Sequence, residues 1–148
     1  MIILAGCMTA AVIAIREKRR IQLLEAWIDL IFHIRTQIDC YLKPIGEILQ
    51  GADAGLLQAC MGTPTDRAPQ ILLERCRPYL SGDAERLLTA FVGEIGCSYR
   101  EEQVKRCDFY MESLRRLSEK EREELPARLR VRTSLCVCAS VGAAILLW

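Results

Sequence analysis

Apolar residues recur at steps of three and four along the first third of the chain. Between positions 21 and 42, this stripe consists of Leu23, Trp27, Leu30, Ile31, Ile34, Ile38, Tyr41 and Leu42. Such spacing places the stripe on one face of a helix, and the charged residues of the same stretch lie off that face. No glycine or proline interrupts positions 7–43. The pattern therefore predicts one long helix that runs from the N-terminal segment into the body of the protein.

Shorter helices are predicted where prolines and glycines separate the next apolar clusters. Pro44 and Gly46 punctuate the chain after the long helix, and a proline is tolerated in the first turn of the helix that follows. Ser81 or Asp83 is expected to cap the last of these short helices. The predicted short helices cover 44–50, 54–61, 71–76 and a stretch that reaches Ile95. The glycines and Pro64 within 51–67 make that segment the loosest part of the chain.

A capping signal separates the last short helix from the C-terminal part. Gly96 is expected to close one helix, and Ser98 and Glu101 have the S-x-x-E spacing of a capping box that opens the next. In such a box the Ser98 hydroxyl accepts a hydrogen bond from the Glu101 amide, and the Glu101 carboxylate accepts one from the Ser98 amide. The next helical stripe is Val104, Cys107, Met111, Leu114 and Leu117. No strand pattern occurs anywhere, so the predicted fold is all-α, an antiparallel helix bundle.

Charge divides the chain into three parts. Positive and negative side chains are nearly balanced, with 20 Lys and Arg against 19 Asp and Glu. All of them lie within 16–132, and the terminal segments 1–15 and 133–148 carry none. A balanced chain has no basic field for nucleic acid, so nucleic-acid binding is not expected. The division predicts a helical bundle domain between two apolar ends.

The apolar ends are interpreted as membrane anchors at the lipid bilayer. As helices they reach roughly 22–24 Å, short of the ~30 Å hydrocarbon core, and local thinning can absorb the mismatch. Cationic residues flank both ends on the inner side, namely Arg16, Lys18, Arg19, Arg20, Arg128, Arg130 and Arg132. Because positive flanks stay cytoplasmic, the bundle is expected to face the cytosol. Two alternatives remain: a lipoprotein processing site at Leu4–Cys7, and a buried core helix at either end.

Small residues recur on both predicted anchors. Gly6 and Ala10 lie on the first, and Ala139 and Gly142 lie at matching depths on the second when counted from the arginine flanks. Membrane helices associate where small side chains let backbones approach. The spacing predicts that the two pairs pack together, within one molecule or between copies, although chance spacing is an equally weighted alternative.

The chain offers little material for catalysis or metal binding. Its eight cysteines include no CxxC pair, and His33 is the single histidine. No phosphate-binding loop, dinucleotide fingerprint, zinc-protease motif or serine-hydrolase elbow occurs. The cysteines are interpreted as reduced thiols facing the cytosol. We therefore expect no enzyme activity, no cofactor and no metal site.

Two motifs and their order carry a resemblance to a known family. Between the apolar ends stand Lys43-Pro44-Ile45-Gly46-Glu47-Ile48-Leu49 and the segment from Ile95 through Gly96 and Ser98 to Gln103. In this arrangement the chain resembles the stage III sporulation protein AB family of endospore-forming bacteria, over nearly its whole length. Lys43 stands where the family usually has Thr, and Tyr99 stands where it usually has Asp.

The resemblance implies a platform or scaffold role in the channel between mother cell and forespore. The family's cytosolic domain is similar to the inner-membrane platform proteins of type II secretion and type IV pilus systems. By that likeness the implied partners are a secretion-type ATPase and the other membrane proteins of the channel, together with copies of this chain. The implied location is the mother-cell membrane around the forespore. The alternatives are a generic two-anchor helical adaptor unrelated to sporulation, and an enzyme or metal protein that uses its thiols.

Overall fold

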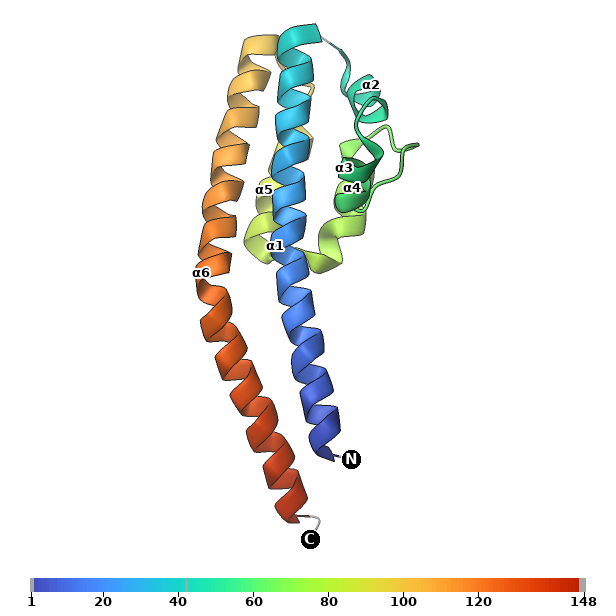
Figure 1. The fold of residues 1–148 in the computed structure, drawn as a ribbon. Helices are drawn as coiled ribbons and strands as arrows, with labels where there is room; N and C mark the ends of the chain where they lie inside the picture. Colours follow the sequence, from blue (N-terminus) through green and yellow to red (C-terminus); the bar gives the residue numbers. More distant parts are fainter. Residues whose placement is uncertain (1, 42, 147–148) are drawn as a thin grey trace.

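Two long antiparallel helices form the frame of the protein. The computed structural model describes residues 2–41 and 43–146, and all regular structure in those ranges is helical. Helix α1 (Ile2–Tyr41) runs up the hairpin and α6 (Arg100–Leu146) runs back down beside it, so both begin or end at the same lower end (Figure 1). The all-α prediction is confirmed, as is the single unbroken first helix.

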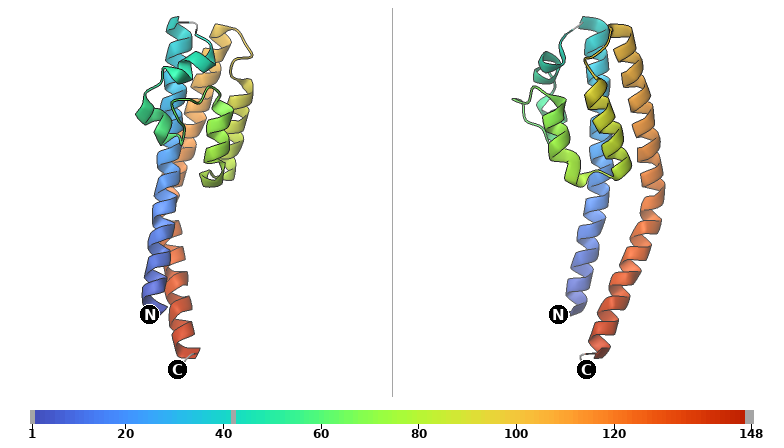
Figure 2. Two further views of the ribbon diagram at one scale, coloured as in Figure 1. Left: turned by 90° about the vertical axis from the view of Figure 1, so that its right-hand side faces the viewer. Right: turned by 180° about the vertical axis from the view of Figure 1, so that it is seen from behind.

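Short helices pack against one side of this pair at its upper half. They are α2 (Ile45–Gln50), α3 (Ala54–Ala59), α4 (Pro69–Cys76), the 3₁₀ turn η1 (Arg77–Tyr79) and α5 (Gly82–Glu94). The right-hand view of Figure 2, from behind, shows them lying over α1 and alongside α6. Ser81 caps α5 by accepting from the Ala84 amide, which decides between the two predicted caps. Asp53 caps α3 in the same way, accepting from the Gly55 and Leu56 amides.

The core lies where the predicted stripe of α1 meets α6 and the short helices. Trp27, Leu30, Ile31 and Ile34 have no exposed surface. The short helices contribute fully buried leucines and Phe91, whose ring meets Tyr110 of α6 edge-on at 5.6 Å. The 3.6-residue period thus identified the buried face correctly from Leu23 to Ile38. At the end of α1 the predicted stripe is wrong for Tyr41, which is 63% exposed, and Leu42 lies outside the described residues.

An ion pair orders part of the segment expected to be loosest. The Asp66 side chain is only 7% exposed and accepts from the Thr63 amide at 2.6 Å. Arg75 of α4 donates to both of its oxygens, at 2.6 and 3.2 Å. These donors, the Thr63 amide first, lower the pKa of Asp66. The loop is therefore fastened to α4 by a buried carboxylate, a contact between residues nine positions apart.

The lower arms of the hairpin carry the segments predicted to be membrane anchors. α6 continues through Pro126 into the second apolar end, and α1 begins in the first. Within 2–41 and 43–146, neither long helix holds an apolar stretch of the length that crossing a bilayer requires. The surroundings of Gly6 and the side chains of Ala10, Ala139 and Arg132 lie outside the part that the structure describes. Gly142 is exposed, and a Cβ built there meets no atom of the described residues within 4 Å, while the packing of the two small-residue pairs stays a prediction.

Candidate functional site

The two sequence motifs meet at the tip of the hairpin, the end farthest from the apolar segments. Gly96 lies between α5 and α6 with a φ of +86°, a conformation that favours glycine. A Cβ at Gly96 would lie 3.0 Å from Cδ1 of Ile45, at the start of α2. Glycine is therefore favoured here by its backbone conformation, and the close approach of Ile45 adds to that preference. The predicted turn at Gly96 is confirmed, and its contact with the first motif is what the sequence did not indicate.

Pro44 and Gly46 play different parts in the first motif. Pro44 stands at the N-cap position of α2 with extended backbone, and its carbonyl accepts from the amides of Glu47 and Ile48. It thus precedes the first turn instead of lying within it. A Cβ at Gly46 would make only ordinary contact, 3.5 Å from the carbonyl oxygen of Arg67. The space around position 46 therefore does not require a glycine.

The predicted Ser98–Glu101 capping box is wrong. α6 begins at Arg100, and the carbonyl of Tyr99 accepts the first intrahelical bond, from the Gln103 amide at 3.0 Å. Tyr99 therefore occupies the N-cap position, one residue after Ser98. The Gln103 side chain instead donates back to the Ser98 carbonyl at 2.5 Å. The S-x-x-E spacing fits a box locally, but the tight turn at Gly96 moves the helix start along the chain.

Arg100 joins the two long helices at the tip. Its guanidinium donates to the Asp39 carboxylate at 2.8 Å and to the Asp39 backbone carbonyl. α1 has no basic residue in its own last turn, so this arginine supplies the positive charge that favours a helix C-terminus. Arg100 thereby fixes the level at which α6 begins beside the end of α1.

A second arginine connects α6 with α5 just below the tip. Arg106 donates to Glu102 at 2.7 Å and lies 3.5 Å from a carboxylate oxygen of Glu94. The hydrogen bond from Arg106 lowers the pKa of Glu102, with a smaller contribution from the Ser98 hydroxyl. The Glu102 carboxylate is thus engaged by an arginine, an arrangement suited to holding shape and unsuited to proton transfer.

Two exposed aromatic side chains lie at the tip of the hairpin. Tyr99 is 90% exposed, and Tyr41 is 63% exposed with the Lys43 ammonium 5.4 Å from its ring centre. Beside them is an open hollow of about 670 Å³, lined by Asp39, Tyr99, Arg100, Glu101, Val104 and Lys105. Exposed tyrosines beside an open hollow are typical of surfaces that bind another protein. The two departures from the family pattern, Lys43 and Tyr99, both lie on this surface.

The buried cysteines lie away from the tip, and their surroundings bear on metal binding and on thiol chemistry. Among the described residues, no three His, Cys, Asp or Glu side chains come together as a metal site would need. Cys60 and Cys76 are fully buried, and burial raises the pKa of both thiols. Burial also raises the pKa of Cys107 to about 11. Thiols in this state are weak nucleophiles and pack as small apolar groups.

The arginines assigned to membrane topology also hold the bundle together. Arg20 pairs with Glu17 at 3.1 Å and with Glu121 of α6 at 3.3 Å, and both carboxylates are only 8% exposed. Arg19 lies 5.6 Å from the ring centre of Tyr79. Arg128 pairs with Glu124, whereas Lys18 and Arg130 are exposed. The i, i+3 spacing of Glu17 and Arg20 was visible in the sequence, but the pairing with Glu121 depends on the hairpin.

Comparison with known proteins identifies the family. No curated protein and no solved structure matches the chain. The family model described as stage III sporulation protein AB matches residues 1–148, which is every residue of the sequence. The match includes both apolar ends and both tip motifs. The chain belongs to the stage III sporulation protein AB family.

Proposed function

We propose that this stage III sporulation protein is a membrane-anchored platform that couples a cytosolic secretion-type ATPase to the membrane proteins of the mother cell–forespore channel. Family membership supports the stage of sporulation. The coupling role rests on one observation of the fold. The described parts of the uncharged ends, 2–15 and 133–146, lie at one end of the hairpin, and the surface formed by both motifs lies at the other (Figure 1).

Anchoring in the mother-cell membrane is part of the proposal. The uncharged ends are shorter than a full bilayer crossing, so they would insert with local thinning of the membrane. The exposed cations that follow the first end and precede the second favour a cytosolic bundle. In that orientation the tip points away from the membrane, into the compartment where an ATPase would reside.

The tip is proposed as the surface that the ATPase contacts. It presents Tyr99 and Tyr41, which are among the most exposed large apolar side chains described. Truncation of a central aromatic residue is the change that most weakens a protein interface. The alternative of an adaptor unrelated to sporulation is disfavoured by the family match.

The test compares Tyr99→Ala with Phe109→Ala in sporulating cells. Both side chains are well exposed on or next to α6, but Phe109 lies away from the tip motifs. We expect Tyr99→Ala to reduce spore formation and co-purification with the secretion-type ATPase by about ten-fold, and Phe109→Ala to leave both unchanged. Equal effects from the two variants, or recovery of the chain outside the membrane fraction, would contradict the proposal.

A further inference from the structure

One face of the α1–α6 hairpin is left uncovered by the short helices. Figure 1 views this face directly, and no other helix lies in front of the two long ones. Helical spacing places residues three and four apart on it. We call it the seam face, and it comprises Glu25, Asp29 and Phe32 on α1 and Arg115, Glu119 and Arg122 on α6.

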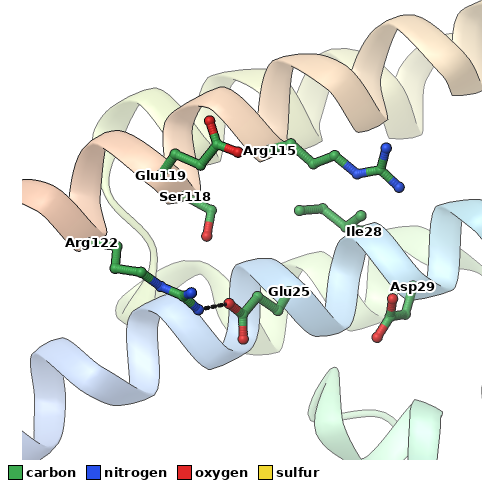
Figure 3. Close-up of a pocket in the computed structure, with 7 residues that line it drawn as sticks. All are labelled: Glu25, Ile28, Asp29, Arg115, Ser118, Glu119 and Arg122. Atoms are coloured by element: carbon green, nitrogen blue, oxygen red, sulfur yellow. Dashed lines mark hydrogen bonds and ion pairs between the residues drawn. The ribbon is translucent and has the colours of Figure 1, made fainter.

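A hollow of about 270 Å³ lies along the lower seam face (Figure 3). Ile28 and Ser118 line it and are each 7% exposed. Arg122 reaches across to pair with Glu25, and this pair shows that the two residues stand at one level of the hairpin. Just above, Phe32 is 55% exposed although it is a large aromatic residue next to the fully buried Ile31.

Two opposite charges of the seam face have no ion-pair partner among the described residues. Asp29 and Arg115 are both exposed, and in Figure 3 no interaction joins either to a neighbour. The Arg115 guanidinium extends over Ile28, whereas the Asp29 carboxylate points away from α6. They stand on opposite walls of the hollow without reaching one another.

Asp29 and Arg115 stand at similar levels on their two helices. Asp29 follows Glu25 by four residues, about 6 Å up α1. Arg115 precedes Arg122 by seven residues, about 10 Å up α6, because the helices are antiparallel. A long arginine side chain spans the difference. The seam face therefore carries acidic residues on α1, Glu25 and Asp29, which we call the acidic wall. At the same level along the hairpin, α6 carries Arg115 and Arg122, which we call the arginine wall.

We propose that a second copy of this chain docks on the seam face, related by a two-fold axis parallel to the hairpin. The parallel orientation rests on the proposed function, since two copies anchored in one membrane by the same ends must point the same way. A two-fold axis of this kind keeps each residue at its own level and sets α1 of one copy against α6 of the other. Asp29 then faces Arg115 of the second copy, twice, and Phe32 is covered.

Such an interface is polar and gains most of its specificity from charge. Its weakness in solution is offset in the membrane, where anchoring raises the effective concentration of one copy around another. The pairing also has an unfavourable element, because Glu119 stands on the arginine wall opposite the acidic wall. Glu119→Gln is therefore expected to strengthen association, the opposite sign to loss of Arg115.

The test uses full-length chains that carry two different affinity tags and are co-expressed in the same membranes. Asp29→Arg in both copies places Arg against Arg, and Arg115→Asp in both copies places Asp against Asp. Each variant should reduce co-purification of the second tag by about ten-fold or more. One copy of each variant restores both opposite-charge pairs, so the mixed sample should recover wild-type co-purification. Within a single chain each variant stays mismatched, which means that only pairing between copies explains recovery.

Arg86→Asp serves as the matched control, since Arg86 is highly exposed on α5 and should leave co-purification unchanged. Helix content measured by circular dichroism verifies that each variant is folded. Failure of the mixed sample to recover, or association insensitive to both reversals, would overturn the inference. Wild-type chain that is found in membranes but does not co-purify overturns the inference alone. Wild-type chain found outside membranes contradicts the proposed anchoring instead.

Discussion

The two sides of α1 are held by different interactions. Toward the short helices, α1 presents an apolar surface in which Trp27 and Ile34 have no exposed area. Along its border with α6, ion pairs recur over most of the body, and they are Arg20–Glu121, Glu25–Arg122, Arg35–Asp108 and Asp39–Arg100. Exposed ion pairs contribute little to the free energy of folding, but they depend on the exact relative position of the two side chains. Burial of apolar surface contributes much more free energy and depends less on exact position. The apolar side therefore supplies stability, and the border with α6 sets the level of one helix against the other.

The largest expected effect is at the apolar side. Trp27→Ala removes a fully buried indole and should lower the free energy of unfolding by about 3–5 kcal/mol. Phe32→Ala removes an aromatic ring that is 55% exposed and should cost less than about 1 kcal/mol. Urea denaturation followed by circular dichroism measures both. Similar losses for the two variants would mean that the seam face of α1 contributes as much stability as its apolar side.

At Arg20 the border between α1 and α6 is largely buried, unlike the exposed ion pairs along the rest of it. Arg20→Met leaves the Glu17 and Glu121 carboxylates at 8% exposure without this arginine, and should cost about 2 kcal/mol. The matched control is Arg116→Met, whose side chain is 77% exposed and pairs with Glu112 one turn away, so a loss below about 0.5 kcal/mol is expected. Both values come from the same denaturation curves. An Arg20→Met protein as stable as the control would mean that this pair only sets the level of the helices.

The tip turn should respond to backbone geometry. Gly96→Ala forces a side chain onto a φ of +86° and against Ile45, and should cost about 1–2 kcal/mol. Gly93→Ala, three residues earlier within α5, meets nothing within 4 Å and should stabilise the helix by up to about 1 kcal/mol. Opposite signs for two neighbouring glycines are expected in thermal melts. If both variants changed the stability in the same direction, the turn at Gly96 would be able to accommodate an alanine.

Acid should loosen the 61–67 loop before the core. The pKa of Asp66 is lowered in the folded state, so its stabilisation is fully present above the unfolded pKa near ~3.9 and is lost as pH falls through the lower folded value. Asp66→Asn should cost about 1 kcal/mol at neutral pH and remove part of the acid-dependent loss. Stability measured from pH 7 to pH 2 in both proteins gives the comparison. Parallel curves would exclude Asp66 as the titrating group.

The smallest effect is expected at Ser98. Because Tyr99 takes the N-cap position and Gln103 bonds the Ser98 carbonyl, Ser98→Ala removes no helix cap. A loss below about 0.5 kcal/mol is expected, against the ~1 kcal/mol that a true N-cap serine would cost. Amide hydrogen exchange of the first turn of α6 gives a local readout alongside the melts. A marked loss of amide protection in that turn would show that Ser98 does cap α6, as the sequence pattern predicted.

Most of the fold follows from short-range patterns. The period of Leu23 to Ile38, the proline before α2 and the glycine after α5 located the helices and the buried face of α1 to within a few residues. These features are local, since a helix is specified by neighbours three and four positions away. The same argument failed at Ser98, where the S-x-x-E spacing competes with a turn whose position depends on α5.

The sequence alone determined the helices, their apolar faces, the uncharged ends and the family, because each depends on composition or on spacing within a few turns. Only the tertiary structure decided that Ile45 closes over Gly96, that Arg100 caps the end of α1, and that Arg20 joins two carboxylates, one of them 101 residues away. The physical reason is distance along the chain. A contact between helices depends on how they pack, and local spacing contains no information about the level at which α6 stands beside α1.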